Sequence, residues 1–431
     1  MTHFVDSTLE SPKRNFLSIS VYLPFLYLFF FINSVGLPLG LEYTTILSPL
    51  FYYWLLKNRQ RWVVTRFLVI SLPFAVFHLL NGIVSLENYI TSYALIMAVY
   101  LVVYTFYLAV TKCKDIDSLF KHIIIVNFIF AILAIPFRDS SYNYLFWWLA
   151  YSGGADMPRL KLLTYEASYY STLLVPFLAF SYFKVIFHKD KYGYLLLFMT
   201  VLPLALSFSF SVITDLFLTL AIVHILFFKR LYRTNKIFFK VAMPVALIII
   251  SAALVMTPFV DRLTDVATGQ DMSGTGRVFW SSLISFEVAS QKSLLWGVGF
   301  GQAKEYYDVM QAFMLEADNS GWMSGRLYNS MAEIFAATGA AGLLLKLGLE
   351  VYFFVTTKPY TNYFRLSLFI FMFLYQFSAS YPTNIAEYAI WIFAFAKVFP
   401  EFDIYKSRVV QACPSVNAGN KVCELSRREA G

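Results

Sequence analysis

The sequence predicts an all-α polytopic membrane protein with about twelve transmembrane helices and a long external loop. Of its 431 residues, 59% are hydrophobic and only 14% are charged, whereas soluble domains carry roughly 25% charged residues. Apolar runs of bilayer-crossing length recur along the chain. Lysine and arginine are concentrated in alternate connections between these runs, as the positive-inside rule expects.

The apolar runs predict the helices in order. A helix needs roughly 20 apolar residues to cross the hydrocarbon core. Twelve runs approach this length, at 16–36, 41–56, 63–82, 90–110, 122–137, 168–186, 193–210, 213–228, 237–257, 331–356, 366–380 and 385–400. The short alternating segments of a membrane β-barrel are absent from the sequence, so helices are the expected spanning elements.

The basic residues predict the orientation. With the N-terminus inside, the inside connections hold 25 lysines and arginines and the outside connections hold 8. The expected organisation is a cytoplasmic N-terminus at 1–15, a membrane domain at 16–400 and a cytoplasmic tail at 401–431. The net charge of +8 comes largely from the inside connections, so no nucleic-acid partner is expected.

Two predicted external segments are unusually long, 138–167 and 258–330. Long connections in compact bundles usually carry function. In the second segment, glycines precede Arg277, and a guanidinium suits phosphate or pyrophosphate because it donates two hydrogen bonds at once. Trp280 follows in an apolar stretch that suits the membrane interface. The alternative is an interfacial helix in which Arg277 contacts lipid headgroups.

The end of the same segment places Arg326, Tyr328, Asn329 and Glu333 before and within the next apolar run. In a helix, positions 326, 329 and 333 share one face. An ionisable group at the end of a span is costly unless it faces a cavity or a partner. Glu333 is therefore a candidate general base or sugar ligand, and the alternative is that Arg326 and Glu333 satisfy each other at the interface.

The first long segment ends with Arg159 and then Glu166, which enters the next run. Glu166 could equally be a residue of the functional site or an anchor at the membrane interface. Asp215 lies near the tip of a tight predicted hairpin, where helix capping explains it. Lys346 and Glu350 are four residues apart within a predicted span, which indicates an ion pair.

The sequence gives little support for metal or nucleotide chemistry. None of the five histidines falls in the long external segments, and no phosphate-binding glycine loop of the GxxxxGK[ST] kind occurs. We therefore expect no metal site and no cofactor.

Three stretches together resemble the O-antigen ligase and polymerase superfamily of bacterial envelope glycosyltransferases. The family patterns are approximately Glu-Pro-Ser, then Ser-Gly-Arg-x-x-x-Trp with Gly-x-Gly-x-Gly, then His-Asn-x-x-x-Glu before a glycine pair. The matching stretches are 159–170, 276–280 with 297–301, and 328–333 followed by Gly339 and Gly342. The sequence departs from the family patterns at two positions: Tyr328 stands at the histidine position and Ala167 at the proline position. The tyrosine in place of histidine favours a polymerase over a ligase.

The resemblance implies a GT-C-like bundle in the bacterial inner membrane that polymerises undecaprenyl-pyrophosphate-linked repeat units on the periplasmic face. The product would be O-antigen of lipopolysaccharide, capsule or another exopolysaccharide. Membrane lipids and a chain-length regulator would be further partners. The expected pyrophosphate ligands are Arg159, Arg277 and Arg326. The expected catalytic acids are Glu166 and Glu333, and the expected substrate contacts are Tyr328, Asn329 and Trp280.

Three other functions remain open. A ligase that transfers glycan to lipid A-core would use the same donor and fold. A glycan flippase would be a transporter, for which charged residues in the middle of several spans are expected. If the protein were a structural scaffold, the clustering of the arginine and glutamate motifs would be a coincidence.

Overall fold

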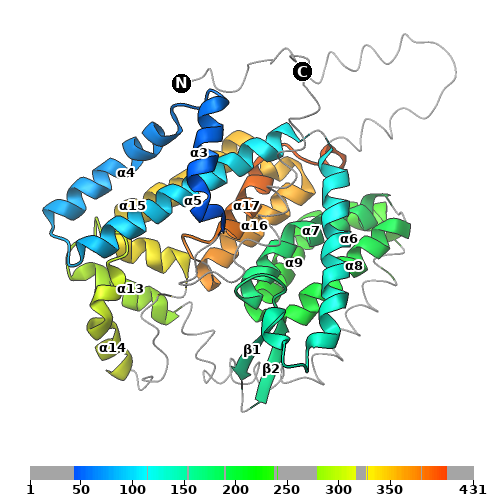
Figure 1. The fold of residues 1–431 in the computed structure, drawn as a ribbon. Helices are drawn as coiled ribbons and strands as arrows, with labels where there is room; N and C mark the ends of the chain where they lie inside the picture. Colours follow the sequence, from blue (N-terminus) through cyan, green and yellow to red (C-terminus); the bar gives the residue numbers. More distant parts are fainter. Residues whose placement is uncertain are drawn as a thin grey trace, which may run out of the picture.

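The chain folds mainly into helices (Figure 1). The computed structural model describes residues 43–113, 115–152, 155–188, 191–236, 240, 279–316, 327, 329–379 and 381–404. Within these residues, six helices are long and apolar enough to cross a membrane. They are α4 (Val63–Leu80), α5 (Leu86–Lys112), α6 (Ile116–Ala134), α7 (Ala167–His188), α9 (Phe210–Thr234) and α15 (Ser330–Thr357).

Three shorter apolar helices complete the bundle: α8 (Lys191–Ser207), α16 (Tyr363–Ser378) and α17 (Ile385–Phe395). The run at 41–56 was expected to span, but it forms two short helices, α2 (Tyr43–Ile46) and α3 (Ser48–Lys57). Helix α3 begins at Ser48 with Pro49 in its first turn, and Leu47 is non-helical, so the run is interrupted. The runs at 16–36 and 237–257 lie outside the described residues. The prediction of a helical membrane protein is confirmed, while the number twelve is not.

Local capping chemistry explains where several helices begin. The side chain of Ser85 accepts the Asn88 N–H at the start of α5, and Asp115 accepts the Ser118 N–H at the start of α6. Asn362 does the same for Arg365 at the start of α16. Each cap satisfies an amide that the first helical turn leaves without a partner.

The first of the two long segments predicted to be external contains a β-hairpin, which departs from the all-α prediction. Strands β1 (Trp147–Ser152) and β2 (Ala155–Leu160) pair antiparallel, with Trp148 opposite Arg159. Trp147 is 3% exposed, and its indole N–H donates to the Ala134 carbonyl at 2.9 Å. This bond fastens the hairpin to the end of α6.

Loss of that bond should loosen the hairpin. Trp147→Phe leaves the Ala134 carbonyl buried without its donor, which costs about 1–3 kcal/mol of stability. We expect a lower thermal unfolding midpoint in detergent. Trp148→Phe is the matched control, because Trp148 is 43% exposed; equal shifts for the two variants would contradict the anchoring role.

The described part of the second segment predicted to be external is folded. It contains α13 (Ser281–Ser290) and α14 (Tyr307–Glu316). Residues from these helices and from the start of α15 form a small core of their own, made of Ile284, Val288, Val298, Met310, Leu327, Ala332 and Ala336. In Figure 1, α13, α14 and the hairpin lie along the lower edge, and the α3–α4 and α5–α6 connections lie along the upper edge.

At the other end of the bundle, the chain after α17 packs back onto the helices. Lys184 lies 2.5 Å from Asp117 and 3.1 Å from Glu401. Phe402 is fully buried in the main core, and Ile404 is 5% exposed. Apolar burial therefore holds the first residues of the segment predicted to be the tail, 401–431, against the bundle through residue 404.

Candidate functional site

Polar side chains converge on the last turn of α16. Three of its residues contact three different helices. Tyr375 accepts a hydrogen bond from the Thr172 hydroxyl of α7 at 3.1 Å. The Gln376 carbonyl accepts from the Ser330 hydroxyl of α15 at 3.4 Å, and the Ser378 hydroxyl donates to Asp215 of α9. The helix ends that were predicted to lie outside therefore meet at one end of the bundle.

An ionic network lies just beneath this end. Lys346 Nζ is 2.5 Å from Glu350 Oε1, so the expected ion pair within α15 is confirmed. Gln376 joins it, since its amide donates to Glu350 Oε2 at 3.2 Å and its side-chain oxygen accepts from Lys346. Charges in a membrane span are costly unless they are paired and hydrogen-bonded. This network therefore ties α15 to α16.

Asp215 does not cap a helix, so that interpretation is wrong. It lies six residues beyond Ser209, the N-cap of α9, which makes no side-chain cap bond. Asp215 is only 8% exposed, and its carboxylate accepts the hydroxyl hydrogen bond from Ser378. Its partner is 163 residues away along the chain, which no local pattern indicates.

Arg159 is half-buried on β2, and its Nε donates to the Ser207 carbonyl at the end of α8 at 3.1 Å. A guanidinium at a helix C-terminus is favoured by the carbonyl dipoles there. Two residues on, Lys161 is also half-buried, and the loss of solvation lowers its pKa. The structure places Arg159 beside the turn between α8 and α9, and its pyrophosphate role stays a prediction.

Glu166 stands directly before α7 and is half-buried. Its carbonyl accepts the Tyr170 N–H at 3.1 Å and the Thr164 hydroxyl at 3.0 Å. A carboxylate at a helix N-terminus is stabilised by the dipole of that helix. The rings of Tyr165 and Tyr169, 5.0 Å apart, flank it in sequence. Both the site role and the anchoring role remain compatible with this position.

At the start of α15, Asn329 is the N-cap. Its side-chain oxygen accepts the Ala332 N–H at 2.7 Å, and the residue is 1% exposed. Its extended backbone (φ −139°, ψ 149°) places it before the helix. The prediction that Asn329 lies on one helical face with positions 326 and 333 is therefore wrong, because an N-cap residue has a non-helical backbone.

Glu333 lies in the first turn of α15 and is half-buried. The carboxylates of Glu333 and Glu387 both lie within electrostatic range of the Tyr388 hydroxyl on α17. Glu387 is 6% exposed and accepts from the Asn384 amide at 2.9 Å. Glu387 was not among the site residues predicted from the sequence. The spacing Asn384-x-x-Glu387, the pattern of a capping box, was the available signal.

The remaining predicted site residues divide into two groups. Trp280 is half-buried and packs against the small core of α13, α14 and the start of α15, edge-on to Phe279 at 5.4 Å. It therefore sits beside the half of α15 that carries Glu333. Arg277, Arg326 and Tyr328 lie outside the described residues.

Helix α15 is sharply bent at Gly339, whose φ of +64° and ψ of −164° are not helical. Ser330 and Lys346 both contact Gln376, although a straight helix would separate them by about 24 Å. Lys346 Nζ also lies 3.5 Å from the Met331 sulfur. The half at 330–338 therefore folds back toward the half at 340–357, and residues of both halves contact α16.

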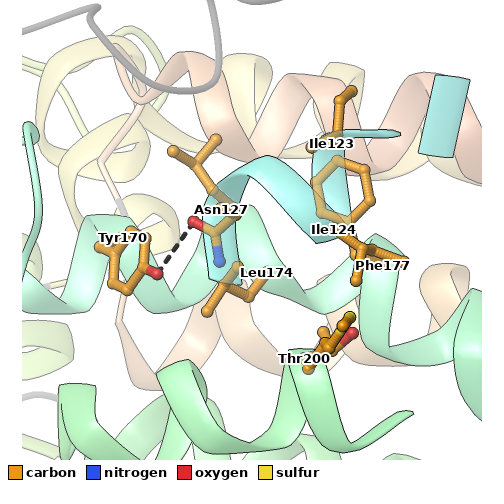
Figure 2. A pocket seen from close by; sticks show the side chains of 9 residues that line it. Ile123, Ile124, Asn127, Tyr170, Leu174, Phe177 and Thr200 are labelled. Atoms are coloured by element: carbon orange, nitrogen blue, oxygen red, sulfur yellow. Dashed lines mark hydrogen bonds between the residues drawn. The ribbon is translucent and has the colours of Figure 1, made fainter. Parts of the chain in front are cut away.

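A small cavity lies between α6, α7 and α8 (Figure 2). The Tyr170 hydroxyl donates to Asn127 there at 2.9 Å. The cavity has a volume of about 10 Å³, room for one water at most. It is too small for a sugar, so we regard it as a packing gap behind α7.

No group of histidine, cysteine, aspartate and glutamate side chains in the described part of the chain has the arrangement of a metal site. Comparison with protein-family models found no match, and a search of curated proteins found no significant relative.

Proposed function

We propose that this protein is a membrane glycan polymerase that uses lipid-pyrophosphate-linked oligosaccharides as substrates. Support comes from one observation above all. Polar side chains from α7, α9 and α15 contact the last turn of α16, at the end where the folded 279–316 segment packs. Lipid-anchored substrates would reach such a site from the membrane plane.

The proposed chemistry is transfer of a growing glycan. A hydroxyl oxygen of the next lipid-linked unit attacks the anomeric carbon of the donor, and the bond from that carbon to the pyrophosphate breaks. Undecaprenyl pyrophosphate leaves, and the hydroxyl proton passes to a carboxylate, Glu333 or Glu166. Arginines stabilise the charge that develops on the leaving group; the assigned ones are Arg159, Arg277 and Arg326.

The function is tested in a strain that lacks the gene, by a gel profile of surface glycan together with an extract of its lipid-linked intermediates. We expect core capped by one repeat unit, or the capsular equivalent, because polymerisation is lost. Long polymer stranded on the lipid carrier would instead indicate a ligase. Repeat units trapped inside would indicate a flippase.

The arginine assignment has its own test. Arg277→Ala should lower polymer yield by about 100-fold or more, since removing one donor to a developing oxyanion has that effect in other enzymes. Arg138→Ala is the control, because Arg138 is exposed in the other external segment and contacts only Asp139, at 4.0 Å, among the ion pairs described. Unchanged polymer length and yield in Arg277→Ala would contradict the assignment.

A further inference from the structure

The bend in α15 leaves backbone groups without intrahelical partners, and one distant segment satisfies them. The N–H groups of Val298 and Gly299 donate to the carbonyls of Ala336 and Ala337 at 2.9 and 3.0 Å. On the other side of the bend, the N–H groups of Ala340 and Ala341 donate to the carbonyls of residues 294 and 295, at 2.9 and 3.0 Å. Unpaired backbone groups at membrane depth are costly, so these four bonds stabilise the bent form.

Two glycines make this close approach possible. Gly297 has a φ of +74°, and a Cβ on it would lie 2.5 Å from the Ala337 carbonyl carbon. Gly339 has a φ of +64°, and a Cβ on it would lie 2.4 Å from the Leu295 carbonyl carbon. Both contacts are with backbone, which cannot move aside as a flexible side chain can. The segment at 293–302 and α15 can therefore approach this closely only because each has a glycine at the contact.

On its other side, the same segment contacts the last turns of α4 and the connection between α4 and α5. The Trp296 ring stacks on Phe77, with centroids 3.9 Å apart. The Trp296 carbonyl accepts from His78 Nε2 at 2.8 Å. Gln302, which is fully buried, accepts the N–H groups of Val84 and Ser85 at 3.0 Å each. The segment thus joins α15 to the end of α4 and the start of α5.

We propose that residues 293–302 form a splint that sets the direction of the first half of α15, and that Gly297 and Gly339 are positioning residues for Glu333. The role in catalysis rests on the proposed function, whereas the splint itself does not. Glu333 lies six residues from the bend, about 9 Å along the helix. A rotation of about 10° at Gly339 would therefore move it by about 1.6 Å, and a 1 Å misplacement can lower turnover about 100-fold.

The test compares three glycine variants. Gly297→Ala and Gly339→Ala should lower polymer formation at least about 10-fold in membranes supplied with saturating lipid-linked repeat units, since turnover rather than binding is affected. Gly348→Ala is the control in the same helix, because a Cβ there meets nothing within 4 Å. His78→Phe is a milder fourth variant that removes the bond to the Trp296 carbonyl without a backbone clash.

The direction of the half-helix is measured separately. Spin labels at Ile334 and Val355, in a variant without the three native cysteines, report the distance across the bend. A straight helix would separate these residues by about 32 Å. We expect a shorter, narrow distance distribution in the parent protein and in Gly348→Ala. It should broaden or lengthen in Gly297→Ala and Gly339→Ala, and in part in His78→Phe.

The outcomes separate the two proposals. An unchanged distance in the variants, with or without loss of polymer, would overturn the splint. A changed distance with normal polymer would overturn the positioning role. If the glycine variants fail to accumulate, His78→Phe decides both points. A parent protein that shows the bend but is not required for polymerisation would leave the splint standing and reject the proposed function.

Discussion

Glu333→Gln should abolish polymer formation, with a loss of turnover of at least about 100-fold. The amide keeps the size and hydrogen-bonding reach of the side chain but cannot accept the acceptor-hydroxyl proton. Glu333 lies in the first turn of α15, and its carboxylate interacts electrostatically with the Tyr388 hydroxyl of α17. The measurement is conversion of lipid-linked repeat units to polymer in membranes that contain equal amounts of each variant protein.

The control for this prediction is Glu287→Gln. Glu287 lies on α13, and its carboxylate accepts from Gln291 of the same helix at 3.2 Å, so we expect normal polymer. Full activity in Glu333→Gln would contradict its assignment as the base. The role would then fall to Glu166, and Glu166→Gln would be the decisive variant.

Lys346→Met should destabilise the protein by about 3 kcal/mol or more, because it leaves the buried Glu350 carboxylate without its cation. We expect a clear fall in the thermal unfolding midpoint of the purified protein. Lys346→Met/Glu350→Leu should recover part of the loss, since the unpaired charge is then gone. Gln376 would still lack its two partners, so recovery should be incomplete.

The matched control is Lys121→Met. Lys121 forms an ion pair with the same spacing, i to i+4, 2.6 Å from Asp117, but its side chain is 45% exposed. Exposed pairs of this kind contribute about 0–1 kcal/mol, and Lys184 remains beside Asp117. A fall in unfolding midpoint as large as that of Lys346→Met would show that burial does not set the cost.

Some residues of the candidate site could be predicted from the sequence and others could not. The position of Glu333 near the start of a helix follows from the apolar run at 331–356, whereas the strand that carries Arg159 was not predicted. The Asn384-x-x-Glu387 spacing was visible but not used. The contact between Ser378 and Asp215 had no local signal, because a hydrogen bond between distant residues depends on how α9 and α16 pack.

The sequence by itself determined the helical membrane character, most helix positions and the pairing of Lys346 with Glu350. These properties depend on hydropathy and on spacing within one helix, which are local. Only the tertiary structure decided that Asn329 caps α15, that a β-hairpin precedes α7 and that α15 bends at Gly339. An apolar run predicts a straight span, whereas the bend is stabilised by backbone hydrogen bonds from residues 294–299. A contact across forty residues of chain leaves no trace in local periodicity.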